Sequence, residues 1–138
     1  MDSNIIKLVK EIKRIAVVGC SRHSYKPAYY VPEYMQNEGY TIIPVNPNAL
    51  GKTILGEGVF QSLRDMPHSV DMINIFRPSD QCLEVLQSII NLETKPKLIW
   101  MQLGIQNQKA KVLAEQYNIP LVMNKCLMVE HRKMDNNY

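Results

Sequence analysis

Long apolar runs are missing from this sequence, and no stretch approaches the ~18 consecutive apolar residues of a membrane-spanning helix. The first residues, Met1-Asp2-Ser3-Asn4, lack the charged start and apolar middle of a signal peptide. Runs of Lys or Arg are absent too, and the net charge is only +3. We therefore expect a cytoplasmic protein that binds neither nucleic acid nor membrane, and whose mild positive charge suits an anionic ligand.

Cysteine is scarce, with only Cys20, Cys82 and Cys126 at wide spacing. An odd number at such spacing makes neither a disulfide framework nor a zinc site, and it fits a reducing compartment. No second His, Cys or carboxylate is recognised at metal-ligand spacing from His131, so we expect no metal site. The charged residues 130–132 are expected on the surface.

The chain of 138 residues fits one domain spanning residues 1–138. Short β-branched apolar runs predict five strands, at residues 14–19, 40–45, 70–76, 97–102 and 119–123. Apolar residues at helical spacing predict helices at residues 3–12, 28–37, 80–91 and 106–117. This alternation predicts an α/β fold: a three-layer Rossmann-like arrangement with a mostly parallel sheet of about five strands flanked by helices.

Caps and prolines predict where these helices begin. Asp2 or Ser3 is expected to cap the first helix, and Ser79 or Asp80 the third. Pro32 is expected in or near the first turn of the second helix, because proline is tolerated there.

The loop after the first predicted strand, Gly19-Cys20-Ser21-Arg22-His23-Ser24-Tyr25-Lys26-Pro27, has features of a phosphate site. Gly19 permits a tight turn and close approach of a ligand. Free N–H groups and the positive end of the next helix would face an anion. Ser21 adds a hydroxyl donor, and Arg22 and Lys26 add positive charge. The alternative is an ordinary loop with solvated basic residues.

The same loop does not match two other nucleotide motifs. An NAD-binding fingerprint needs G-x-G-x-x-G and an acidic residue after the second strand. Here Ser21 and Ser24 occupy the later glycine positions, and the second strand is followed by Asn46-Pro47. The Walker A pattern fails as well, because Asn46 stands where the first glycine before Gly51-Lys52-Thr53 should be. NAD is therefore disfavoured.

Several ordered motifs resemble the stand-alone CoA-binding domain proteins, which are related to the N-terminal domain of the succinyl-CoA synthetase α subunit. The matching stretches are V-V-G-C-S at 17–21, K-P at 26–27, Y-T-I-I-P-V-N-P at 40–47, G-K-T-I-L-G at 51–56, F-R-P at 76–78, W-M-Q-L-G-I at 100–105 and N-K-C-L-M-V-E-H at 124–131. The resemblance covers about residues 12–133. It implies a Rossmann-like fold that binds coenzyme A.

Residue by residue, the resemblance implies that Gly19, Ser21 and Lys26 hold the phosphates. Asn46-Pro47 would flank the adenosine, Phe76-Arg77-Pro78 would line the passage for pantetheine, and Gln102 and Cys126 would lie towards its thiol end. The family often has Ser after K-P, whereas this chain has Ala28, which removes one hydroxyl donor. The complete expected set is Gly19, Cys20, Ser21, Arg22, Lys26, Pro27, Ala28, Asn46, Pro47, Phe76, Arg77, Pro78, Gln102 and Cys126.

Three functions remain open at this point. The first is a coenzyme A or acyl-CoA binding module without chemistry of its own. The second is a small NAD(P)-dependent oxidoreductase or CoA-dependent transferase, for which Cys20, Cys126 and His131 are the candidate reactive groups, none with an evident partner. The third is a regulatory subunit that senses coenzyme A. A homodimer or a protein partner is left open, because no interface can be derived from the sequence.

Overall fold

A five-stranded sheet forms the centre of the protein, as described by a computed structural model for residues 1–135. Its strand order is β2-β1-β5-β6-β7, and every pairing in it is parallel. The strand bounds are β1 Arg14–Val18, β2 Thr41–Val45, β5 Met72–Ile75, β6 Leu98–Met101 and β7 Leu121–Val122. The five expected strands are confirmed, each one to three residues shorter than the run that predicted it.

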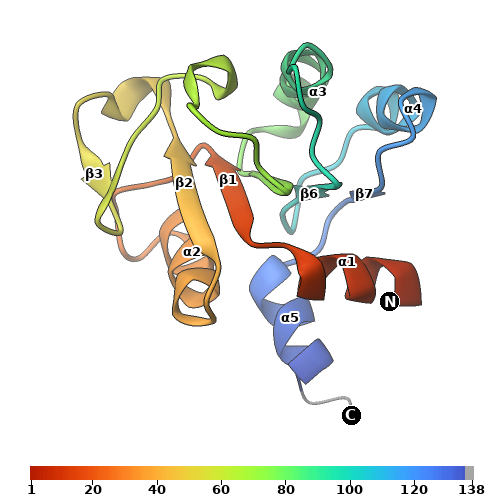
Figure 1. The fold of residues 1–138 in the computed structure, drawn as a ribbon, viewed down its shortest axis with the longest axis horizontal. Coiled ribbons are helices and arrows are strands. Elements are labelled where there is room, and N and C mark those ends of the chain that lie inside the picture. The colour runs from red at the N-terminus through yellow and green to blue at the C-terminus, as the bar shows by residue number, and fades with distance from the viewer. Residues whose placement is uncertain (136–138) are drawn as a thin grey trace.

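Helices lie on both faces of this sheet (Figure 1). Their bounds are α1 Ser3–Glu11, α2 Pro27–Asn37, α3 Cys82–Ile90, α4 Gln108–Gln116 and α5 Leu127–Asp135. Short 3-10 turns occur at Pro47–Ala49, Leu63–Asp65 and Ser79–Gln81, and a small antiparallel hairpin joins β3 (Thr53–Ile54) to β4 (Glu57–Gly58). No helix within residues 1–135 is long and apolar enough to cross a membrane.

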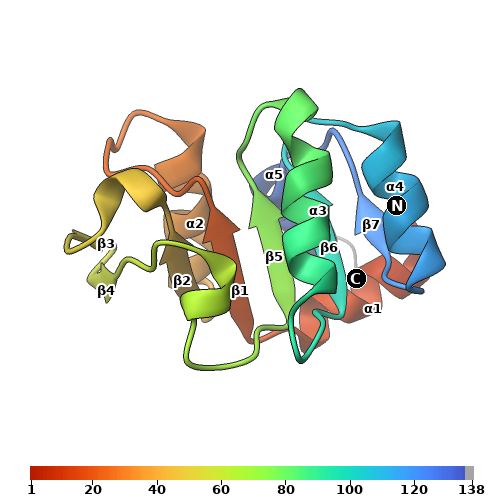
Figure 2. The same ribbon diagram turned by 90° about the horizontal axis from the view of Figure 1, so that it is seen from above.

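Two apolar cores separate the layers, because successive strand residues point to opposite faces. Ile15 and Val17 of β1 join one core with residues of α1, α2 and α5. Ala16 joins the other core with residues of α3 and α4. Figure 2 shows α3 in front of the sheet and α2 behind it. The three-layer Rossmann-like arrangement is therefore as expected.

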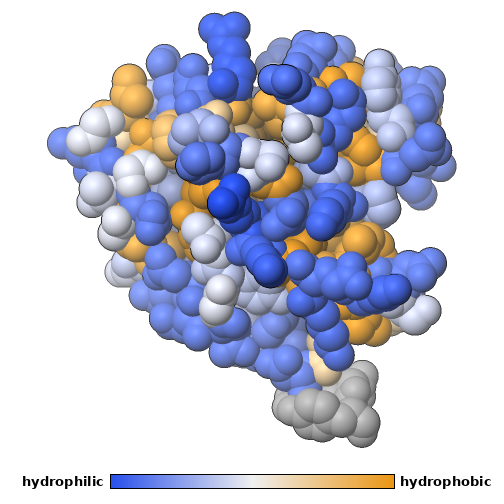
Figure 3. Space-filling model, in the orientation of Figure 1, coloured by the Kyte–Doolittle hydropathy of each residue, from blue (hydrophilic) through white to orange (hydrophobic). Residues whose placement is uncertain are grey.

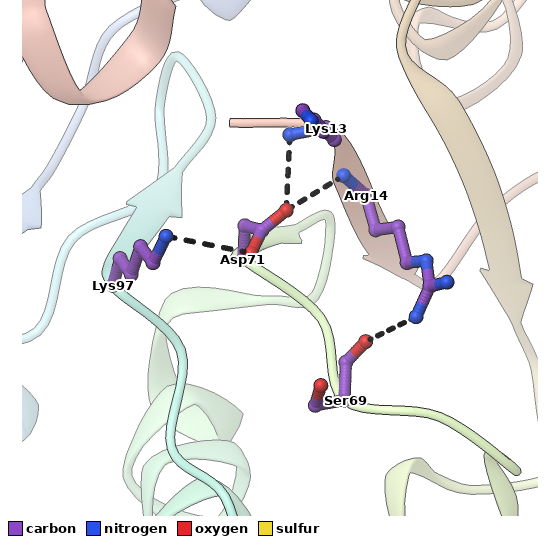
Figure 4. Close-up of polar contacts among 5 residues, drawn as sticks. All are labelled: Lys13, Arg14, Ser69, Asp71 and Lys97. Carbon is purple, nitrogen blue, oxygen red and sulfur yellow. Dashed lines mark hydrogen bonds and ion pairs between the residues drawn. The ribbon is translucent and has the colours of Figure 1, made fainter. Parts of the chain in front are cut away.

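The surface in the orientation of Figure 1 is mostly hydrophilic, with hydrophobic side chains scattered between the polar ones (Figure 3). Asp71 links the first residues of neighbouring strands at the amino-terminal end of the sheet (Figure 4). One carboxylate oxygen accepts hydrogen bonds from the backbone N–H groups of Lys13 and Arg14, each at 3.0 Å, and the other lies 3.9 Å from Lys97 Nζ. The ionised carboxylate thereby ties the starts of β1, β5 and β6 together.

These contacts also change the acidity of Asp71. Partial burial alone would raise the pKa of this carboxyl group. The two N–H donors and the positive charges of Lys97 and Arg14 outweigh burial and lower that pKa below its usual value. The folded state therefore favours the charged form of Asp71.

Two expectations about helix starts are wrong. Pro32 lies inside α2, not in its first turn, because the helix already begins at Pro27. The helix after β5 has no side-chain cap, since Ser79 Oγ instead accepts a hydrogen bond from the N–H of Gln106. Asp2, by contrast, caps α1 as expected, through Asn4 N–H at 2.7 Å.

Candidate functional site

The carboxyl ends of β2, β1 and β5 meet in a tightly packed junction at Gly19. Its N–H donates to the carbonyl of Val45 at 2.8 Å, and its φ is +84°. A Cβ at this position would lie 2.5 Å from the carbonyl oxygen of Phe76 and 3.3 Å from Arg77 Cδ. Only glycine fits here, and the chain turns away from the sheet where its strand order reverses, which is where open α/β sheets bind ligands.

Hydrogen bonds within the chain fix the loop that follows Gly19. Ser21 N–H donates to the carbonyl of Ala28 at 3.1 Å, and Ser21 Oγ accepts from His23 N–H at 3.0 Å. Lys26 N–H donates to the carbonyl of His23 at 3.0 Å. The N–H groups of Arg22 and Ala28 have no acceptor among residues 1–135. The start of a helix favours negative charge, so N–H groups without an acceptor beside the start of α2 are donors of the kind that bind an anion.

Asn46 joins the loop after β2 to the loop after β1. Its Nδ2 donates to the carbonyl of Cys20 at 2.8 Å, and its Oδ1 accepts from Asn48 N–H at 2.9 Å. Cys20 is fully buried, and burial raises the pKa of its thiol to about 12. The Cys20 side chain therefore packs in the core and does not face the loop surface.

A cleft of about 260 Å³ opens between the Gly19 turn and α3. It brings together Gly19, Pro47 and Arg77, three of the residues expected from the sequence. The Arg77 guanidinium is hydrogen-bonded to Gln81 Oε1 across the start of the helical segment. The complete lining is Val18, Gly19, Val45, Pro47, Gln61, Ser62, Leu63, Arg77, Gln81, Glu84, Val85 and Ser88.

Part of this lining was not anticipated from the sequence. Gln61 and Ser62 reach the cleft because Phe60 is anchored beside β2, donating its N–H to the Pro44 carbonyl and accepting from Asn46 N–H. No motif in the sequence marks that anchoring. Glu84 and Ser88 could have been identified from the sequence, because positions 81, 84, 85 and 88 lie on one face of a helix.

Gln102 and Cys126 lie apart from the cleft. Gln102 is buried, and its Oε1 accepts from Leu127 N–H at 3.3 Å, so this side chain anchors the start of α5. Cys126 is half-buried and precedes α5, with Glu130 N–H donating to its carbonyl. Phe76 and Cys126 both pack against the core that α2 and α5 share, on the face opposite the cleft.

His131 lies in a polar cluster far along α2 from the Gly19 loop. Its Nδ1 is 2.8 Å from Tyr34 Oη, 3.9 Å from Glu38 Oε1 and 3.8 Å from Asp135 Oδ2. His131 is buried, so the expected surface position is wrong. The expected absence of ligand spacing is also wrong, because the ligand atoms of Glu38, His131 and Asp135 lie within 4.8 Å of one another. Burial, with Glu38 and Asp135, raises the pKa of Tyr34 and keeps its hydroxyl protonated.

A family model described as a CoA binding domain matches residues 13–132. The chain belongs to this family. Its match takes in the Gly19 loop, the Asn46 junction and the start of α5, which is the region that the resemblance of the sequence motifs had covered.

Relatives of similar length support the assignment. The uncharacterized protein YneT of Bacillus subtilis (strain 168) is 33% identical over 129 residues, covering 94% of this chain and 93% of the relative. A solved Thermus thermophilus protein is 34% identical with a TM-score of 0.92, covering 97% of this chain and 99% of the other. A hypothetical protein from Pyrococcus horikoshii OT3 is 26% identical with a TM-score of 0.88, covering 97% and 92%.

Proposed function

We propose that this protein binds coenzyme A or an acyl-CoA through the loop between β1 and α2, and that it is a binding module without chemistry of its own. One observation supports the proposal most strongly. This chain of the CoA binding domain family has a hydrogen-bonded loop at the point where the strand order of its sheet reverses. Within the described residues 1–135, that loop leaves backbone N–H groups without an acceptor at the start of a helix. This arrangement suits the pyrophosphate of coenzyme A.

The resemblance to the CoA-binding domain proteins implies where the rest of the ligand lies. Asn46 and Pro47, at the end of β2, would flank the adenosine half. Phe76, Arg77 and Pro78, at the end of β5, would line the path of the pantetheine arm. The cleft of about 260 Å³ is smaller than the ~300–1,000 Å³ of pockets that enclose whole ligands. We therefore expect the cleft to hold one part of coenzyme A and the remainder to lie along the edge of the sheet.

The lining of the cleft favours binding over catalysis. Among residues 1–135 it contains Ser62, Ser88 and Glu84 but no His or Cys, so neither serine of the lining has a histidine beside it to act as its base. Cys20 and Cys82 are buried with raised thiol pKa values, and His131 lies near the other end of α2. If the protein turned over an acyl-CoA and the Cys126→Ala variant lost this activity, a CoA-dependent transferase would replace the binding module as the proposed function.

Calorimetric titration with coenzyme A, dephospho-CoA, ATP and NAD tests the proposal. Coenzyme A should bind more tightly than NAD, and ligand at 100 times its Kd should stabilise the protein by about 2.7 kcal/mol. Lys26→Ala should weaken coenzyme A by about 1.5–3 kcal/mol, tenfold or more, by removing a charge-assisted contact. Lys7→Ala, an exposed lysine on α1, is the control and should bind as the wild type does.

Heat from NAD but none from coenzyme A would reject the proposal. Equal affinity of the Lys26→Ala variant and the wild type would reject the placement of the phosphates.

A further inference from the structure

The carbonyl of Ala28 in the first turn of α2 has an unusual partner. In an unbroken α-helix it would accept a hydrogen bond from the N–H of residue 32. Position 32 is proline, which has no N–H to give. The carbonyl instead accepts from the N–H of Ser21, at 3.1 Å, in the loop between β1 and α2. A gap in the hydrogen bonding of the helix is thus filled by the loop.

The ring of Pro32 adds a second effect to the missing donor. A proline inside a helix crowds the carbonyl four residues before it and tilts that carbonyl away from the helix axis. Here the crowded carbonyl belongs to Ala28, and it accepts a hydrogen bond from the Ser21 N–H. Pro32 itself is buried, so packing holds the ring in place.

The bond between Ser21 and Ala28 determines what the loop presents to a ligand. Because Ser21 N–H is directed at α2, this serine is left with its hydroxyl as the donor to an anion. Its Oγ already accepts from His23 N–H at 3.0 Å, which orients the hydroxyl and directs its hydrogen elsewhere. Two N–H groups without an acceptor within the described chain lie next to this bond: that of Arg22, which follows Ser21, and that of Ala28 itself.

We propose that Pro32 is a positioning residue for the loop between β1 and α2: it keeps the Ala28 carbonyl for Ser21 N–H and so fixes the loop in its anion-binding conformation. Its effect on ligand affinity rests on the proposed coenzyme A function, whereas its effect on the loop does not.

Two variants restore the missing N–H donor. Pro32→Ala does so but leaves unfilled volume in the core, and Pro32→Val does so while filling most of that volume. In both, residue 32 competes for the Ala28 carbonyl and the carbonyl turns back towards the helix axis. Pro67→Ala, which removes an exposed loop proline, is the matched control.

Amide hydrogen exchange of the ligand-free protein reports on the loop directly. Ser21 N–H should be protected in the wild type and in Pro67→Ala, and should exchange about fivefold to tenfold faster in both Pro32 variants, as expected for the loss of one hydrogen bond. The melting temperature of Pro32→Val should stay equal to that of the wild type or rise, because an interior helix position favours valine over proline. Ser21 protection that is unchanged in both variants would overturn the proposal.

Titration with coenzyme A then measures the consequence for binding. Both Pro32 variants should bind about fivefold to tenfold more weakly than the wild type, and Pro67→Ala should not. Faster Ser21 exchange with unchanged affinity would overturn the positioning role. If the wild type fails to bind coenzyme A, the proposed function fails, and the exchange experiment still decides whether Pro32 fixes the loop.

Discussion

Gly19→Ala tests the close junction of β1, β2 and β5. The substitution has two separate costs. An alanine at φ +84° is strained by about 1–2 kcal/mol. Its Cβ would also lie 2.5 Å from the Phe76 carbonyl oxygen, so the backbone after β5 must move, which costs about 1–3 kcal/mol by analogy with overpacked cores. The expected total loss in the free energy of unfolding is about 2–5 kcal/mol.

Gly51→Ala separates the two costs. Gly51 has nearly the same φ, +82°, but a Cβ at this position would meet nothing within 4 Å among the described residues. The Gly51→Ala variant should therefore lose only about 1–2 kcal/mol of its free energy of unfolding, which is the conformational cost alone. Urea unfolding of the wild type and both variants measures the difference, which is the cost of the clash with Phe76.

Binding supplies the second measurement on the same variants. Because the clash moves the strand ends that carry the loop, Gly19→Ala should weaken coenzyme A by about tenfold or more, while Gly51→Ala should have a smaller effect. If Gly19→Ala is no more destabilising than Gly51→Ala, the close packing of Gly19 against Phe76 does not exist in solution, and the reasoning about this junction is refuted.

Three further predictions concern other parts of the molecule. Asp71→Ala should lower the free energy of unfolding by about 2–3 kcal/mol at pH 7. Because the pKa of Asp71 is lowered in the folded state, its contribution to stability is present above the ordinary carboxyl pKa of about 4 and is lost as the pH falls through the lower, folded pKa. Urea unfolding should therefore show the gap to the wild type closing as the pH falls below about 4, and a gap that persists in acid would contradict this. Asn74 is buried, and its amide has no hydrogen-bond partner among residues 1–135, so Asn74→Leu should raise the free energy of unfolding by about 1–3 kcal/mol, whereas a loss would reveal a partner. Cys126 should form a mixed disulfide with CoA disulfide before Cys20 or Cys82, which are buried with raised thiol pKa values; peptide mapping that finds the adduct only on Cys82 would refute this.

The sheet could be predicted because its strands are short β-branched runs buried on both faces, and such runs have few other stable placements. The candidate site was placed by the same reasoning, since parallel strands place their loops along one edge, and it stays a prediction. Gly19 was expected at a tight turn for this reason, and the structure adds why it is glycine: the neighbouring Phe76 carbonyl, distant in sequence, leaves no room for a Cβ.

Features that depend on packing between distant segments were not predicted. His131 is buried because α2 brings Tyr34 and Glu38 against α5, and no local pattern at 130–132 indicates this contact. Pro32 was expected at the helix start because an interior proline breaks a hydrogen bond, but Ser21 from the preceding loop replaces that bond. Gln61 and Ser62 line the cleft only because Phe60 pairs beside β2.

The central claim is that the loop between β1 and α2 holds the phosphates of coenzyme A. Titrating coenzyme A into isotope-labelled protein and following the backbone amide resonances tests it most directly. The largest shifts should fall on the amides of Arg22 and Ala28, which have no acceptor among residues 1–135, with smaller shifts at Asn46 and Arg77. Shifts that spare this loop and concentrate elsewhere, for example around His131, or no shifts at saturating coenzyme A, would contradict the account.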